Sequence, residues 1–508
     1  MEQTFLEIRT FVASHPAVLL AGAVALVWTA SRVWGTDRIT RWVQRAAVGA
    51  AAAYAAIVVG AWATPTYVDH VEPTVVSTAA ALVAGRDLYP VDRANGAHAL
   101  PYGPVLYGWL GAWGATFGFG VASIKTGLTL IWLAGMACVA AALRRVRPGW
   151  RADWCLTVAT CGAFGSAPVW ARAESSLLAV VALGMLAATT RSWMSAWLFG
   201  ASLGLAAGIK ITGVLFLLPL VPAIIERAGA WRTIVWSPVI AAVVLFAPFF
   251  HPAIQLSGFL EILRLAGGQG FRPRAIATGA EWATLLILPA VVMWWGSRTR
   301  ARVAWQSVSL LALAGAVIAV LASKIGAGPY YFLPLVPVAI FVAGETADRR
   351  LGVVRHAATC TAIALLAVQG AYWWGYGRDA HGVRAEAEAV ARRREYGASV
   401  AVGYGPRYRL SFARPVLGGS HEAYPFDAVT LMEYQLAGRD GVEVLAGQMR
   451  RCATENWLLP KNGAPFDLPN AYVPDRQVFP ESFKAAFRDH YAIVASGDYF
   501  DVWRCRTP

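Results

Sequence analysis

The chain has 508 residues, of which 57% are hydrophobic and 15% are charged, and its mean hydropathy is +0.49. Soluble enzymes carry about 25% charged residues, so this composition excludes an ordinary soluble enzyme and indicates that lipid is the main solvent. The formal net charge is +14. It does not indicate nucleic-acid binding, because the arginines form short clusters between apolar runs, where orientation in a bilayer explains them.

Twelve apolar segments are candidates for membrane-spanning helices. A span needs about 20 apolar residues, and fewer where neighbouring helices shield it. The fold class expected from them is a polytopic α-helical membrane protein with about twelve spans. The expected spans are residues 15–34, 45–63, 124–143, 154–171, 176–190, 195–209, 211–225, 234–250, 283–296, 304–322, 329–344 and 356–374.

The arginine clusters give this bundle an orientation. Basic residues accumulate in cytoplasmic loops, and threading the twelve segments alternately places every cluster on one side. That side is then the cytoplasm of a multi-pass inner (plasma) membrane protein, and the long loops 65–123 and 251–282 are extracytoplasmic. The clusters are Arg32/Arg38/Arg41/Arg45, Arg144/Arg145/Arg147/Arg151, Arg191, Arg227/Arg232, Arg298/Arg300/Arg302 and Arg349/Arg350/Arg355.

One further apolar stretch, Pro104 to Phe117, lies inside the first long loop. Counting it as a span would move the Arg144 cluster to the outside. We therefore expect a helix that lies in the membrane interface without crossing it.

After residue 374 the composition changes, because charges return and Pro and Gly interrupt the chain. Residues 375–508 are expected to form a small extracytoplasmic α/β domain, separate from a membrane module of residues 1–374. Its expected helices are 381–396 and 483–490, and its expected strands include 399–402 and 491–494. Cys452 and Cys505 form a disulfide if this domain lies outside the cytoplasm, and the sequence leaves their pairing open.

Asp69 and Glu72 are the first candidates for chemistry. They stand three residues apart, hence on one face if this segment is helical, just after the second expected span. A carboxylate there can act as a general base on an acceptor hydroxyl. The alternative, a helix cap in a solvated loop, carries equal weight from these residues alone.

The same loop contains two further motifs in a fixed order. Residues 85–90 read Gly-Arg-Asp-Leu-Tyr-Pro, and residues 101–107 read Pro-Tyr-Gly-Pro-Val-Leu-Tyr. An early acidic residue, a Gly-x-x-Leu-Tyr-Pro turn and a Tyr-x-Pro motif that opens an interfacial helix resemble the first external loop of the GT-C superfamily. These are glycosyltransferases that depend on lipid phosphates, and the nearest branch is the family-39-like bacterial enzymes.

The resemblance continues through the membrane module. Residues 171–175, Ala-Arg-Ala-Glu-Ser, are similar to the Arg-x-Asp/Glu turn of that superfamily, and residues 204–213 are similar to its Gly-Leu-Ala-x-x-x-Lys-x-x-Gly hairpin. Residues 324–331, Lys-Ile-Gly-Ala-Gly-Pro-Tyr-Tyr, match a place where it often has a basic residue and aromatics. The resemblance covers most of residues 45–345 in order and topology.

Two departures limit what carries over. Many relatives have two acidic residues next to each other in the first loop, whereas His70 and Val71 separate Asp69 from Glu72 here. The choice of base between these two carboxylates is therefore open. The C-terminal domain varies across the superfamily and says almost nothing about the acceptor.

The resemblance implies a sugar on a polyprenyl monophosphate as donor, and a lipid phosphate as leaving group. Cations are needed to hold it, and for each of them the alternative is snorkelling to the interface or pairing with a carboxylate. We favour phosphate binding for Lys210 and Lys324, which interrupt apolar sequence where a charge is expensive. The full set of candidates is Lys210, Lys324, Arg172, Arg264, Arg272 and Arg274.

Supporting roles are expected for Glu174, which pairs with Arg172 and then orients a group near Asp69 without acting as the base, and for His70 and His98 as secondary ligands. The aromatic residues Tyr102, Tyr330 and Tyr331 line a groove or anchor the interface. No metal cage is visible in the sequence, and a divalent cation with Asp69 and Glu72 is an open alternative.

The sequence thus predicts an inverting glycosyltransferase that moves a sugar from a polyprenyl monophosphate to an extracytoplasmic glycan, glycolipid or protein. In a single displacement Asp69 deprotonates the acceptor while cations stabilise the phosphate. The alternative is a polytopic transporter or lipid flippase, which a dozen helices with buried Lys and Glu would also suit.

Overall fold

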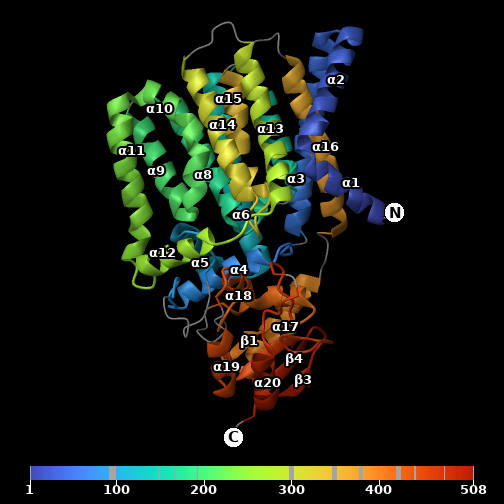
Figure 1. Cartoon of the computed structure of the whole chain (residues 1–508), viewed down its shortest axis with the longest axis vertical. Coiled ribbons are helices and arrows are strands. Elements are labelled where there is room, and N and C mark those ends of the chain that lie inside the picture. Colours follow the sequence, from blue (N-terminus) through green and yellow to red (C-terminus); the bar gives the residue numbers. More distant parts are fainter. Residues whose placement is uncertain are drawn as a thin grey trace.

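The computed structural model describes residues 2–506, except residues 64, 91–98, 148, 166, 192, 297–301, 346–351, 377–380, 419–424, 440–441 and 474. Figure 1 shows a bundle of long helices with a smaller domain at one end of it, and the C-terminus lies at the far end of that domain. The arrangement confirms the expected fold class, a polytopic helical membrane protein with a small C-terminal α/β domain.

Each of the twelve expected spans contains helix, but the expected span 154–171 is continuous helix only as far as Gly162, where α7 ends, and the short η2 (Ala167–Val169) follows later. Among the described residues, eight helical segments are long and apolar enough to cross a membrane. They are α2 (Pro16–Trp34), α3 (Thr36–Ala63), α6 (Val121–Val146), η3 with α10 (Ile211–Leu220 and Val221–Ala228), α11 with η4 (Ala230–Phe246 and Ala247–Phe250), α13 (Pro273–Trp295), α14 (Arg302–Ala322) and α16 (Gly352–Tyr376). The other four expected spans are shorter helices, namely α7 (Trp150–Gly162), α8 (Ala173–Thr189), α9 (Trp193–Ile209) and α15 (Leu335–Glu345).

The shorter helices lie inside the bundle. In α8, thirteen of the seventeen residues are buried, including Ser175 and Ser176 at its start. A helix shielded by its neighbours need not match the full bilayer thickness, and non-helical backbone at its ends is tolerated where protein buries it. This explains why α8 and α9 meet breaks at Arg172 and Lys210, the positions that carry the charged motifs.

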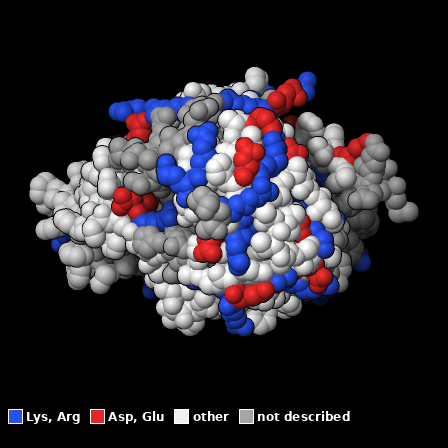
Figure 2. Space-filling view, turned by 90° about the horizontal axis from the view of Figure 1, so that it is seen from below, with Lys and Arg blue, Asp and Glu red and all other residues white. Residues whose placement is uncertain are grey.

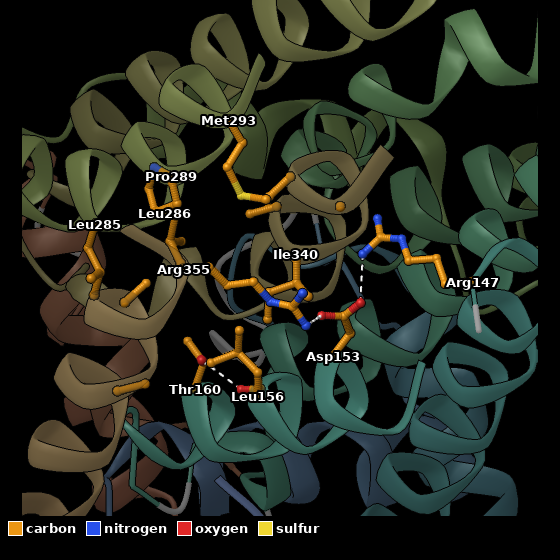
Figure 3. Close-up of a pocket in the computed structure, with 15 residues that line it drawn as sticks. Arg147, Asp153, Leu156, Thr160, Leu285, Leu286, Pro289, Met293, Ile340 and Arg355 are labelled. Carbon is orange, nitrogen blue, oxygen red and sulfur yellow. Dashed lines mark hydrogen bonds and ion pairs between the residues drawn. The ribbon is translucent and has the colours of Figure 1, made fainter. Parts of the chain in front are cut away.

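Arginine side chains form ion pairs at the end of the bundle remote from the small domain. α6 begins next to that domain, where the Val121 N–H donates to Glu386, and it runs away from it. Beyond its other end, Arg147 and Arg355 both pair with the buried Asp153 (Figure 3). The adjoining cavity has a volume of only about 50 Å³ and a mainly apolar lining. The ion triad links α7 to α16, and a hydrogen bond from Arg147 to the Phe341 carbonyl links it to α15. Of the expected clusters, Arg298, Arg300, Arg349 and Arg350 lie outside the described residues.

Three shorter helices lie where the bundle meets the small domain: α4 (Val71–Val83), α5 (Pro104–Phe117) and α12 (Leu256–Gly267). The expected helix at Pro104–Phe117 is confirmed. Helix α4 was not among the expected elements, because its 13 residues are too few for a span and show no polar face. It is stable here because eleven of its residues are buried.

A close backbone approach fixes the start of α5. The Gly103 N–H donates to the Ile209 carbonyl at 2.8 Å. A Cβ atom on Gly103 would lie 2.1 Å from the Gly208 carbonyl oxygen, so no other residue fits without a shift. This contact brings the Tyr-x-Pro motif to the break between α9 and η3.

The C-terminal domain contains a four-stranded sheet of order β1-β2-β4-β3, in which β1 and β2 are parallel and the other pairs are antiparallel. The elements are α17 (His381–Tyr396), β1 (Val400–Val402), η7 (Tyr408–Leu417), α18 (Ala428–Leu436), α19 (Val442–Arg450), β2 (Asn456–Pro460), α20 (Glu481–His490), β3 (Tyr491–Ser496) and β4 (Phe500–Cys505). The expected helices and strands are all present. Where this domain begins, at residue 375, stays a prediction.

The core of the C-terminal domain is aromatic. Trp457 of β2 and Phe466 are fully buried, with ring centroids 5.4 Å apart, and Phe483 of α20 packs edge-on against Phe466. Aromatic side chains bury large apolar areas, so the domain holds a core of its own. Figure 2 shows basic and acidic side chains interspersed over its outer face.

A disulfide joins Cys452 to Cys505 across 53 residues. It links the end of β4 to the turn after α19. The sequence left this pairing open, and the structure makes it.

We expect the double substitution Cys452→Ser with Cys505→Ser to lower the free energy of unfolding of the C-terminal domain by about 2–4 kcal/mol, because the link restricts the unfolded chain. Thermal unfolding of the purified protein in detergent measures this. Cys360→Ser, which removes a free cysteine from α16, is the control. Equal melting of the double variant and the wild type would contradict the expectation.

Candidate functional site

Asp69 lies in the turn that leads into α4, and both of its carboxylate oxygens have partners. Oδ1 accepts the Val71 N–H at 2.9 Å, and Oδ2 forms an ion pair with Nη1 of Arg172. Asp69 is 18% exposed and Arg172 5% exposed at their side chains. The structure therefore brings the first-loop carboxylate and the Arg-x-Glu motif together, although 103 residues separate them.

Arg172 connects this carboxylate to a third segment. It precedes α8 with extended backbone, and its Nη2 donates to the Tyr330 hydroxyl at 2.7 Å. Tyr330 belongs to η5 (Pro329–Phe332), and its ring centroid is 4.2 Å from the guanidinium carbon. The Nε of Arg172 is buried without a hydrogen-bond partner among the described residues.

A second buried ion pair lies beside the first. Lys210 Nζ donates to Glu174 Oε1 at 2.7 Å, and the ammonium lies 3.5 Å from the Tyr331 ring centroid and 5.6 Å from that of Tyr102. An ammonium over aromatic faces is stabilised by the ring quadrupoles. Glu174 thus pairs with Lys210, whereas the sequence analysis favoured Arg172 as its partner. Its Oε2 has no partner within the described part of the chain.

Glu72 is fully buried and makes a third ion pair, with Lys125 on the first turn of α6. Its Oε1 accepts the Val68 N–H at 2.8 Å, and its Oε2 accepts the Ala171 N–H at 2.9 Å. These contacts tie the residues just before Asp69 to those just before Arg172. They favour a structural role for Glu72, while a catalytic role stays an untested prediction.

Lys125 was not among the basic residues predicted from the sequence. The signal was available, because this lysine interrupts an apolar run in the same way as Lys210 does, and a charge there is expensive without a partner.

The remaining basic candidates lie around the second long loop. Lys324 is partly buried, and its Nζ donates to the Ala266 carbonyl at the end of α12 at 2.9 Å. Arg264 is 79% exposed and pairs with Glu261. Arg272 and Arg274 are exposed at the start of α13. Among the basic candidates, Arg172 and Lys210 are thus buried and Lys324 is partly buried. The three arginines of residues 251–282 are exposed.

The C-terminal domain contributes residues next to the candidate site, and no sequence motif predicted them. Arg414 of η7 and Asp427 pair at 2.8 Å, and both also contact the Thr74 hydroxyl on α4. Glu433 of α18 accepts the Gln269 side-chain amide in the Gly-rich turn after α12. These contacts seat the domain directly on the segments that carry Asp69 and Lys324.

A cavity of about 590 Å³ opens beside Asp69. The bundle contributes to its wall through α13 and α16, α1 (Glu2–Ser14) contributes Arg9, and the C-terminal domain contributes Arg409. Aromatic side chains make up much of the remaining lining, including Trp170 and Trp282. The volume is sufficient for a sugar-sized group next to the carboxylate.

The electrostatic environment keeps Asp69 ionised. Burial raises the pKa of its carboxyl, but Arg172, His70, the Val71 N–H and Lys125 lower it, and the resulting pKa lies below the ordinary value. A carboxylate held in this form accepts protons, and it binds the neighbouring guanidinium tightly in the resting site.

Within the described residues, no group of three or more His, Cys, Asp and Glu side chains is arranged to hold a metal ion. His98, a secondary candidate from the sequence, lies outside the described residues.

Comparisons with known proteins reveal a relationship only at the level of structure. No family model matches the chain, and no curated protein is similar to it in sequence. Two solved structures of ArnT from Cupriavidus metallidurans do match. The apo structure gives a TM-score of 0.56 at 14% identity, over 89% of this chain and 96% of that chain.

The second structure, of ArnT bound to undecaprenyl phosphate, gives a TM-score of 0.53 at 14% identity, over 89% of this chain and 97% of that chain. The match extends over nearly the whole length of both proteins, so it includes at least part of the C-terminal domain as well as much of the bundle. This chain therefore has the fold of ArnT, which is the GT-C type of fold that the order of its sequence motifs implied.

Proposed function

We propose that this protein is an inverting membrane glycosyltransferase that takes a sugar from a polyprenyl monophosphate and transfers it to a glycan, glycolipid or protein outside the cytoplasm. The observation that carries the proposal is the ion pair of Asp69 with Arg172, because Asp69 lines a cavity to which both the bundle and the C-terminal domain contribute residues. Support comes from the shared fold, since one of the matching ArnT structures is bound to undecaprenyl phosphate.

In the proposed reaction, Asp69 takes the proton of an acceptor hydroxyl as that oxygen attacks the anomeric carbon of the donor sugar. The bond between this carbon and the phosphate oxygen breaks at the same time. The phosphate leaves with the bonding electron pair as polyprenyl monophosphate, and the proton stays on Asp69 until solvent removes it. A single displacement inverts the configuration at the anomeric carbon.

Arg172 has two proposed tasks. In the resting site it neutralises Asp69, and its Nε, which has no partner among the described residues, leaves it one donor for a phosphate oxygen. When the donor phosphate draws the guanidinium toward itself, Asp69 loses part of its counter-charge and its pKa rises. The carboxylate then becomes a stronger base at the moment when both substrates are bound.

Lys210 and Lys324 complete the proposed phosphate site. Lys210 is held by Glu174 and Tyr331, so its ammonium has little freedom to move. Among the described residues, Lys324 Nζ donates a hydrogen bond to a backbone carbonyl alone, and a phosphate would be a stronger partner. Tyr102 and Tyr330 line the same region. Arg264, Arg272 and Arg274 remain candidates for an earlier, solvent-exposed contact with the donor.

We place the active site on the extracytoplasmic or periplasmic face. Arg147 and Arg355 lie at the end of the bundle remote from the C-terminal domain, as the positive-inside bias requires of a cytoplasmic end. The Cys452–Cys505 disulfide supports an oxidising compartment for the C-terminal domain.

Replacement of Asp69 by Asn tests the proposed base. We expect release of polyprenyl phosphate from a polyprenyl-phosphate sugar, in the presence of an acceptor extract, to fall by about a hundredfold or more, because a positioned base contributes about 10²–10⁴. Asp467→Asn, which removes a half-exposed carboxylate of the C-terminal domain, is the control. Wild-type turnover in the Asp69 variant would exclude this residue as the base. Donor binding without turnover in every protein would favour the transporter or flippase.

Replacement of Lys324 by Met tests the phosphate site. A charge-assisted hydrogen bond contributes about 1.5–3 kcal/mol, so we expect the KM for the donor to rise by about tenfold to a hundredfold while kcat changes less. Lys461→Met is a matched control, because Lys461 Nζ also donates to a backbone carbonyl, that of Gly497, at 2.8 Å. An unchanged KM in the Lys324 variant would remove this lysine from the donor site.

Replacement of Glu72 by Gln separates structural from catalytic use of this residue. Because Lys125 then loses its buried partner, we expect the free energy of unfolding to fall by about 3–5 kcal/mol, with partial recovery when Lys125→Met is added. Thermal unfolding in detergent gives both values. Loss of turnover at unchanged stability would instead support a catalytic Glu72.

A further inference from the structure

The C-terminal domain contacts the candidate base indirectly. Its residue Tyr472 contacts His70, and His70 in turn contacts Asp69. The imidazole of His70 lies between Asp69 and Tyr472, with Nδ1 3.2 Å from Asp69 Oδ1 and Nε2 3.0 Å from the Tyr472 hydroxyl. Tyr472 follows His70 by 402 residues and belongs to the other domain. From this geometry we infer that Tyr472 is a positioning residue, which orients Asp69 for proton transfer by fixing the ring of His70. The inference rests on the proposed function.

The directions of these contacts follow from the chemistry of the three groups. An ionised carboxylate only accepts hydrogen bonds, so the ring nitrogen that faces Asp69 must carry the proton. In a neutral imidazole the other nitrogen is then an acceptor, and the Tyr472 hydroxyl donates to it. Fixing one ring nitrogen therefore fixes the tautomer and the orientation of the other.

The surroundings of His70 keep the ring neutral. Burial lowers its pKa, Arg172 and Arg414 lower it further, and the opposing effects of Asp69 and Asp427 do not restore the ordinary value. The ring of Tyr408, on η7, also faces His70, at 6.2 Å between centroids. At neutral pH the ring thus has one donor and one acceptor, which matches its two partners.

Tyr472 is itself firmly held. Its side chain is 8% exposed, and its backbone N–H donates to Asn470 Oδ1 at 2.7 Å. The Asn470 side chain in turn donates to Gln435 on α18 at 2.7 Å. On the membrane side, a Cβ atom on Gly326 would lie only 3.4 Å from Tyr472 Cζ and 3.6 Å from Glu433 Oε1. The hydroxyl is therefore presented from a rigid loop that packs against the segment after Lys324.

This arrangement gives the C-terminal domain a role in the reaction itself. A base is effective only when its lone pair is aligned with the proton that it removes, and small misalignments are costly. Without the Tyr472 hydroxyl, the His70 ring can rotate, and its Nδ1–H group then turns away from Asp69 Oδ1. The carboxylate then loses a neighbouring imidazole that lowers its pKa, so its pKa rises, and it also loses a fixed orientation.

Tyr472→Phe tests the inference, because it removes only the hydroxyl. We expect kcat for release of polyprenyl phosphate to fall by about tenfold, part of the contribution of a positioned base, while the KM for the donor is unchanged. The acidic limb of the pH profile of kcat/KM should shift to higher pH. The matched control is Tyr408→Phe, because the buried Tyr408 hydroxyl has no hydrogen-bond partner among the described residues, and it should behave as wild type.

Two substitutions of His70 divide its two contacts. His70→Asn keeps an amide near the Nδ1 position that faces Asp69, and His70→Gln keeps one near the Nε2 position that faces Tyr472. We expect His70→Asn to retain more activity than His70→Gln, and Tyr472→Phe to have little further effect in either variant.

Wild-type kcat and an unshifted pH profile in Tyr472→Phe would overturn the inference. An equal loss in Tyr472→Phe and Tyr408→Phe would also overturn it, because packing alone would then explain the effect. Failure of the proposed function has a different signature, since the wild-type protein would then release no polyprenyl phosphate at any pH.

Discussion

The candidate site depends on the cost of burying charge. Asp69 and Arg172 lie at the end of an apolar bundle, where an unpaired charge would be strongly destabilising, and their mutual ion pair removes most of this cost. The same applies to Glu72 with Lys125 and to Glu174 with Lys210. Each pair joins two different segments, so satisfying the charges also sets the positions of the loops that carry them.

The pairs differ in what they leave available. Glu72 has partners on both oxygens and is closed off from the cavity wall, whereas Asp69 lines the cavity and Arg172 keeps an unused donor. Glu174 also keeps one oxygen, Oε2, that has no partner in the described part of the chain. A site that holds its charges in incomplete networks is prepared for a ligand that completes them, because the protein has already borne the cost of desolvation. This distinction favours a structural role for Glu72 and supports the proposed catalytic role of Asp69.

Much of the fold could be predicted from the sequence, and the reasons are physical. Apolar length and arginine placement predicted twelve spans, and helix is present in each of these segments, eight of which belong to helices long and apolar enough to cross a membrane among the described residues. The charges at Arg172, Glu174 and Lys210 were identifiable because they interrupt apolar sequence. Lys125 gave the same signal and was overlooked.

Other features could not be read from the sequence. Helix α4 has neither the length of a span nor a polar face, so only its burial under the C-terminal domain reveals it. The partnership of His70 with Tyr472, and that of Thr74 with Asp427, join residues more than 350 positions apart. A single sequence contains no local pattern for such contacts. The contacts of the C-terminal domain with the candidate site are therefore visible only in the structure.

The central claim is that the donor is a sugar on a lipid monophosphate. The most direct measurement supplies the wild-type protein in liposomes with either a polyprenyl-monophosphate sugar or a nucleoside-diphosphate sugar, together with an acceptor extract, and follows the labelled sugar and the released carrier. We predict that sugar transfer and release of polyprenyl monophosphate occur in equal amounts, and that the nucleotide sugar is not consumed. Consumption of the nucleotide sugar, or movement of the intact lipid-linked sugar across the bilayer without cleavage, would contradict it.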